Sequence, residues 1–77
     1  MNADVERERL ERAWPDEYAD GARCAFHKRH PGRREPGGYP YGFHQWPLDQ
    51  RNAWFAGFNF GLLERQRALA LLEKAHG

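Results

Sequence analysis

A segment of seventeen residues that cannot be helical divides this chain in two. Residues 31–47 contain four of the five prolines and four of the eight glycines. Proline lacks the amide hydrogen that a helix needs, and glycine inside a helix costs about 1 kcal/mol relative to alanine. The sequences on both sides are rich in helix formers, and no stretch alternates polar and apolar residues as a strand does. The sequence therefore predicts two helices joined by a long connector.

The first main helix is predicted over residues 15–30, where Tyr18, Ala22 and Phe26 recur at helical spacing. Residues 1–14 also favour a helix, because glutamate and arginine alternate there and can pair one turn apart. Pro15 suits the first turn of a new helix. We therefore expect a separate N-terminal helix, or a sharp kink, before Pro15.

The second main helix is predicted over residues 48–75. Gly57 and Gly61 lie one turn apart in it and leave a flat surface on an otherwise aromatic helix. Small residues on the first main helix can dock against that surface: Gly21, Ala22 and Ala25. The expected fold is all-α and forms a single domain, with the two main helices as an antiparallel hairpin.

The end of the second helix has an apolar edge of its own, formed by Leu69 and Leu72. We expect this end to extend past the hairpin. Two interpretations stay open, because the edge can pack on residues 3–13 or on another copy of the chain.

Charge is spread unevenly although the formal net charge is only +1. Residues 1–20 hold seven acids and three arginines, whereas residues 23–34 hold five cations and no acid. A local basic block attracts phosphate even in a nearly neutral protein. The alternative is an ordinary solvated helix end followed by a loop.

The residue types disfavour catalysis. The chain has no serine, no threonine and no glycine-rich phosphate loop with its lysine. Cys24 lies one turn from His27, but a cysteine inside an apolar helix stripe is typically a small buried hydrophobe. His30 and His44 could ligate zinc with Cys24 and His27, yet no second pair has a matching spacing. We expect no enzyme activity, no cofactor and no metal.

A single cysteine precludes an intrachain disulfide, and the first residues contain no apolar stretch of the secretory type. No apolar run is long enough to cross a bilayer. We therefore expect a cytoplasmic protein without a membrane partner.

The connector carries four rings between residues 39 and 46. Unpaired bases stack on such rings, and arginine holds phosphate beside them. Alternatively, the rings fold inward as a lid over the two helices. The residues predicted to bind RNA or another partner are Arg23, Lys28, Arg29, Arg33, Arg34, Tyr39, Tyr41 and Arg51.

Three short segments follow one another in a recognisable order. YADGARCA precedes YPY, which precedes RNAWFAGFNFG. This order resembles the ribosome modulation factor family, whose pattern is Tyr-x-x-Gly-x-x-Ala, then Cys-Pro-Tyr, then Arg-x-x-Trp-Leu-x-Gly-Trp. The matching positions are Tyr18, Gly21, Ala25 (displaced by one, with Cys24 at the strict position), Pro40, Tyr41, Arg51, Trp54 and Gly57. The chain differs in having Tyr39 in place of the cysteine, a longer connector and a nearly neutral charge.

The resemblance implies a small bacterial protein of two helices that binds the small ribosomal subunit near the 3′ end of its RNA. Such proteins block initiation and promote pairing of idle ribosomes during hibernation. Two other functions stay open. One is a protein-binding adaptor or inhibitor from a mobile element, which would use the acidic first helix. The other is the ATP-dependent modification of a fluoroquinolone, which is linked to a sister branch.

Overall fold

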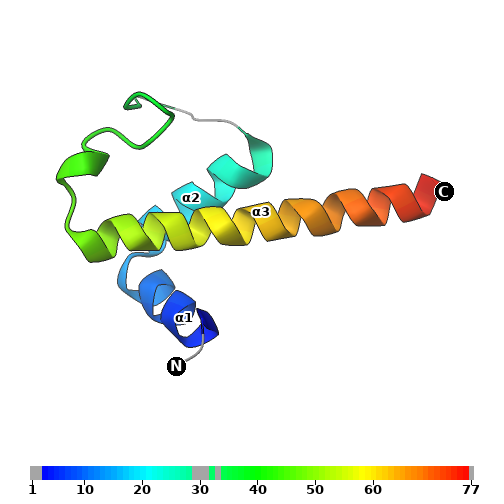
Figure 1. Cartoon of the computed structure of the whole chain (residues 1–77), viewed down its shortest axis with the longest axis horizontal. Coiled ribbons are helices and arrows are strands. Elements are labelled where there is room, and N and C mark those ends of the chain that lie inside the picture. Colours follow the sequence, from blue (N-terminus) through cyan, green and yellow to red (C-terminus); the bar gives the residue numbers. More distant parts are fainter. Residues whose placement is uncertain (1–2, 29–31, 33, 77) are drawn as a thin grey trace.

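The computed structural model describes residues 3–28, 32 and 34–76 of the 77-residue chain. Its α-helices are α1 (Ala3–Ala13), α2 (Pro15–His27) and α3 (Leu48–His76), and a 3₁₀ helix, η1 (Phe43–Gln45), precedes α3 (Figure 1). Within these residues no strand forms, and a single antiparallel bridge pairs Arg34 with Pro40. The predicted all-α fold is confirmed.

Two separate helices precede the connector, because the chain leaves helical geometry at Trp14. Trp14 has φ −136° and ψ 66°, and Pro15 occupies the first turn of α2. Proline is tolerated there since its missing amide hydrogen would have no helical partner. The predicted new start at Pro15 is therefore confirmed.

Helix α2 ends earlier than the predicted residue 30. Lys28 adopts a left-handed conformation with φ 52°, which turns the chain out of the helix after His27. One of the last carbonyl groups of α2, that of Phe26, accepts a hydrogen bond of 2.6 Å from Arg65 Nη1 of α3. Helix α2 therefore ends beside Arg65 of α3.

Glycines bring α2 and α3 into backbone contact, as the sequence predicts. A Cβ atom on Gly57 would overlap the carbonyl oxygen of Tyr18, and one on Gly61 would overlap that of Ala22. The fit is reciprocal, because a Cβ atom on Gly21 would overlap the Trp54 carbonyl and lie 2.9 Å from the Phe58 amide nitrogen. No residue with a side chain fits at these positions while the helices keep this separation.

The connector folds back over the hairpin as a lid (Figure 1). Phe43 is 3% exposed and packs with the buried Cys24 and Trp54. Tyr39 stacks on Phe43 with ring centroids 4.8 Å apart, and Trp46 joins the same cluster. Tyr41 is the exception, with 58% of its surface exposed. Most connector rings therefore form a lid, and one faces outward.

Helix α1 packs on the side of α3 away from the connector (Figure 1). Leu10 is its buried anchor, at 4% exposure. Arg9 bridges to Asp49 at 3.3 Å, and Arg7 Nη1 donates to the Tyr18 hydroxyl at 3.4 Å. These contacts place α1 beside the first half of α3.

Residues 66–76 of α3, called the overhang from here on, extend beyond the end of α2 (Figure 1). Leu69, Leu71 and Leu72 are 47%, 68% and 55% exposed there. The expected extension is confirmed, but the interpretation that this end packs on residues 3–13 is wrong. None of the helices in the described residues has both the length and the apolar character needed to span a membrane.

Candidate functional site

The Asp20 carboxylate joins three segments of the chain through hydrogen bonds. Arg34 Nη1 and Nη2 donate to its two oxygens at 2.9 Å each, and Trp54 Nε1 donates to Oδ2 at 2.8 Å. The three side chains come from the connector, α2 and α3. Bidentate pairing of this kind fixes orientation as well as charge. The Asp20 carboxylate therefore ties the lid to both helices of the hairpin.

Hydrogen bonds to Arg34 hold the pKa of Asp20 below its ordinary value of 3.8. Partial burial acts in the opposite direction but is the weaker effect. The same hydrogen bonds raise the pKa of Arg34. Both groups thus stay charged and neutralise each other at physiological pH.

Cys24 lies beside this ion pair. Its thiol is 1% exposed, and Sγ lies 3.9 Å from Asp20 Oδ2. Burial and the neighbouring carboxylate raise the pKa of the thiol. A cysteine nucleophile needs a lowered pKa and access, so this environment suits the predicted buried hydrophobe and not a reactive thiol.

The structure separates the predicted binding residues from one another. Arg34 lies in the ion pair with Asp20, and the Tyr39 ring lies half-buried in the lid cluster. Arg51 is half-buried on the first turns of α3, and its Nε atom is buried with no hydrogen-bond partner in the part of the chain that the structure describes. Arg29 and Arg33 lie outside the described residues. Among the described residues, Arg34 and Tyr41 line one groove, whereas Arg23 and Lys28 belong to the last turns and the end of α2.

Tyr41 lies in acidic surroundings. It lines an open groove of about 370 Å³ together with the paired Asp20 and Arg34 and with two further acids at the start of α2, Asp16 and Glu17. Acidic groups repel phosphate, so an RNA strand is not expected to reach this ring. The predicted combination of connector rings and arginines as one RNA platform is not what the geometry favours.

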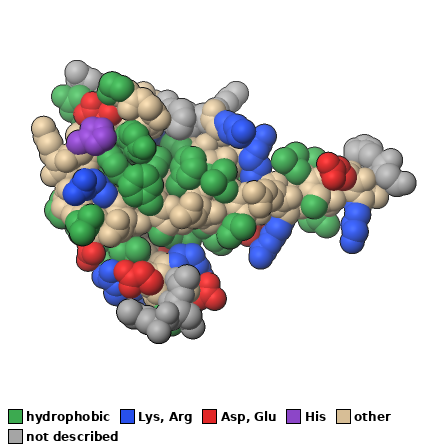
Figure 2. Space-filling view, in the orientation of Figure 1, with side chains coloured by type: hydrophobic (Ala, Val, Ile, Leu, Met, Phe, Trp, Pro, Cys, Tyr) green, Lys and Arg blue, Asp and Glu red, His purple; other side chains and the backbone are tan. Residues whose placement is uncertain are grey.

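Arg23 and Lys28 are both exposed cations. Both belong to the last turns and the end of α2, where Arg65 of α3 also lies against Phe26. Figure 2 shows lysine and arginine side chains gathered where α2 ends above α3. We call Arg23, Lys28 and Arg65 the cationic end. Sequence reasoning missed Arg65, because nothing local to residues 60–70 shows that α2 stops beside it.

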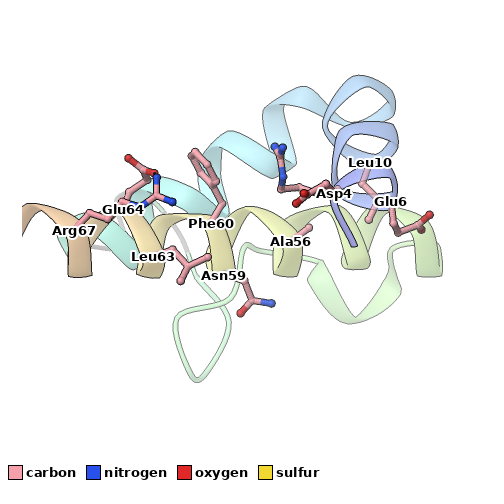
Figure 3. A pocket seen from close by; sticks show the side chains of 10 residues that line it. Asp4, Glu6, Leu10, Ala56, Asn59, Phe60, Leu63, Glu64 and Arg67 are labelled. Carbon is pink, nitrogen blue, oxygen red and sulfur yellow. The ribbon is translucent and has the colours of Figure 1, made fainter. Parts of the chain in front are cut away.

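A second concave surface lies between α1 and α3. It has a volume of about 570 Å³ and an apolar floor of Leu10, Ala56, Phe60 and Leu63 (Figure 3). Its α1 lip carries Asp4 and Glu6. The guanidinium of Arg7 lies 5.6 Å from the centroid of the Phe60 ring, within reach of a cation–π interaction. We call this surface the α1/α3 groove.

Among the residues that the structure describes, no three His, Cys, Asp or Glu side chains gather as a metal site would require. His30, one of the four candidate ligands, lies outside those residues.

A scan against models of protein families, a search of curated proteins and a search of solved structures found no match for this chain.

Proposed function

We propose that this protein is a non-catalytic, cytoplasmic RNA-binding protein that contacts the small ribosomal subunit and inactivates translation in idle cells. The observation that carries the proposal is the separation of charge in the fold. The cationic end lies on one side of α3, and α1, which carries four acids against three arginines, lies on the other (Figure 1). A phosphate backbone can therefore approach Arg23 and Lys28 without meeting α1.

Internal pairing removes much of the remaining charge from the outer surface. Arg34 and Asp20 neutralise each other beneath the lid. On α1, Arg9 pairs with Glu6 at 2.6 Å and Arg7 pairs with Glu11 at 3.3 Å. The net charge of +1 hence understates the positive potential at the cationic end, where Arg23 and Lys28 form no ion pair among the described residues. Phosphate contacts supply much of the affinity of proteins for nucleic acids.

The residues behind the family resemblance support the fold part of this proposal most directly. Tyr18, Gly21, Trp54 and Gly57 all lie at the contact between α2 and α3. The spacing of these four residues along the chain is the spacing that close packing of α2 against α3 requires. The RNA-binding part rests on the cationic end instead.

Sedimentation through a sucrose gradient with small ribosomal subunits tests the proposal. We expect the protein to migrate with the subunits and to detach as salt is raised. The double variant Arg23→Glu, Lys28→Glu should weaken this migration strongly, and each lost phosphate contact should reduce the salt slope by about one. Arg12→Glu is the matched control, because Arg12 is an exposed cation on α1. A protein that stays at the top of the gradient at low salt, or equal behaviour of both variants, contradicts the proposal.

A second candidate function is a protein-binding adaptor or inhibitor. The α1/α3 groove favours it, since the groove combines an apolar floor with an acidic lip that suits a basic partner. A pulldown that recovers one protein and resists nuclease treatment would support this function. In that case, Arg23→Glu with Lys28→Glu should leave the recovery unchanged.

A further inference from the structure

We infer that the overhang of one copy of this chain lies in the α1/α3 groove of a second copy, in a reciprocal antiparallel dimer. The inference is independent of RNA binding, because the cationic end takes no part in it. Its starting point is that two apolar surfaces lie uncovered on one face of the same helix. One is the floor of the groove and the other is the overhang.

The two surfaces form a single stripe along α3. Phe60, Leu63, Arg67 and Leu71 follow one another at steps of three or four residues, so they share a face. Phe60 is 37% exposed, Leu63 56% and Leu71 68%. The first two lie in the groove, and Leu71 lies on the overhang. Figure 3 shows Phe60, Leu63 and Arg67 on successive turns of α3.

The lengths of the two surfaces match. The overhang is about 16 Å long at 1.5 Å per residue. An isolated helical extension of this length is marginal in water unless another surface covers its apolar residues. The groove spans residues 56–67 of α3, which is nearly the same length of helix. If the two copies are related by a two-fold axis near Arg67, the overhang of each copy covers the groove of the other. Neither surface is then left open, as an isologous interface requires.

Charge favours a second copy over an unrelated helix. With the axis near Arg67, Leu63 faces Leu71 of the second copy, and Lys74 of the second copy comes level with Phe60. There it meets the lip of the groove, which carries Asp4 and Glu6. The two Arg67 side chains approach each other at the axis, but each is 75% exposed and pairs with its own Glu64 at 3.1 Å. Their mutual repulsion is thus offset.

The covered area is small, because two leucines and one phenylalanine per copy contribute most of it. Interfaces below about 1,200 Å² in total are typical of weak association. We therefore expect a monomer at low concentration and a dimer at about 100 µM, which corresponds to a dissociation constant in the upper micromolar range.

Adjacent leucines on different faces of the overhang give a matched test. Leu71 lies on the shared stripe, whereas Leu72 lies about 100° further round the helix. Both are exposed, so neither substitution disturbs the hairpin. Sedimentation equilibrium of the full chain should show that Leu71→Glu abolishes the concentration-dependent rise in mass and that Leu72→Glu keeps it. A monomer at every concentration overturns the inference. Loss of the dimer in the Leu72→Glu variant also overturns it, whether or not the Leu71→Glu variant loses the dimer as well.

Crosslinking tests the register separately. Leu63 and Leu71 are eight residues apart, about 12 Å along one helix, which is too far for a disulfide within one chain. Under oxidising conditions, the double variant Leu63→Cys, Leu71→Cys should form a covalent dimer at high concentration. Each single variant should remain monomeric, since Cys24 is buried. A covalent dimer in either single variant, or none in the double variant, contradicts this register.

Discussion

The indole Nε1 of Trp54 lies 2.8 Å from Oδ2 of Asp20, an oxygen that also lies 2.9 Å from Nη1 of Arg34. Trp54 is 34 positions from Asp20 in the sequence, and Arg34 is 14 positions from it. Both side chains meet at this one carboxylate. The side chains of Arg34 and Asp20 are 13% and 23% exposed, so water competes little for these hydrogen bonds. The contact makes the connector part of the folded core.

Removing the charge of Asp20 should weaken the attachment of the lid. Asp20→Asn keeps the shape of the side chain but removes the negative charge that pairs with Arg34 in a mostly buried position. We expect the free energy of unfolding to fall by about 2 kcal/mol, less than for a fully buried pair. Urea denaturation measures this change. Asp16→Asn is the control, because Asp16 is exposed on the same helix, and it should change the free energy by less than about 0.5 kcal/mol.

The ion pair should also show energetic coupling. In a double-mutant cycle of Asp20→Asn and Arg34→Gln, the double variant should lose less free energy of unfolding than the two single variants lose together. We expect the difference to be about 1 kcal/mol or more. Additive losses would mean that the two residues stabilise the fold independently.

Stability should depend on pH through Asp20. Because its pKa is lowered in the folded state, the ion pair stabilises the fold fully above the unfolded value near 3.8. This contribution is lost as the pH falls through the lower folded value. The difference in free energy of unfolding between the native chain and Asp20→Asn should therefore be largest near neutral pH and should shrink below about pH 4. A difference that stays constant down to about pH 2 would contradict this origin.

Adding one methyl group at the helix contact should be severely destabilising. Gly57→Ala introduces a Cβ atom into the Tyr18 carbonyl, and backbone atoms cannot turn aside as a side chain would. We expect a loss of about 3 kcal/mol in free energy of unfolding, although alanine favours the helix by about 1 kcal/mol. Thermal denaturation followed by circular dichroism measures the loss. Asn52→Ala, at an exposed position of α3, should leave the stability unchanged or slightly raised.

The lid and the outward ring should respond differently to truncation. Phe43→Ala removes a ring that is 3% exposed and should cost about 3–4 kcal/mol. Tyr41→Ala removes a ring that is 58% exposed and should cost less than about 1 kcal/mol. Chemical denaturation of both variants compares them directly. Equal losses would show that Tyr41 is as much a part of the lid as Phe43.

Several features of the fold could be predicted from sequence alone. Proline and glycine interrupt helices for local steric reasons, so the connector and the start at Pro15 follow from residue type. Gly57 and Gly61 indicate a close contact, because their spacing leaves a flat surface whatever packs there. The end of α2 was harder to predict. Helix α2 ends at a left-handed residue, and that residue is Lys28 and not a glycine that would signal the end.

The candidate site could be predicted only in part, since sequence cannot show where charges meet. Arg34 and Asp20 belong to blocks of opposite charge in the sequence, and only the return of the connector over the hairpin pairs them. Arg23 and Lys28 stay exposed in the folded chain. The sequence by itself determined the helices, their break and their close approach, because these depend on residue type and local spacing. Tertiary structure alone decided which charges are cancelled and which apolar stripe remains uncovered, because both depend on the path of the chain through space.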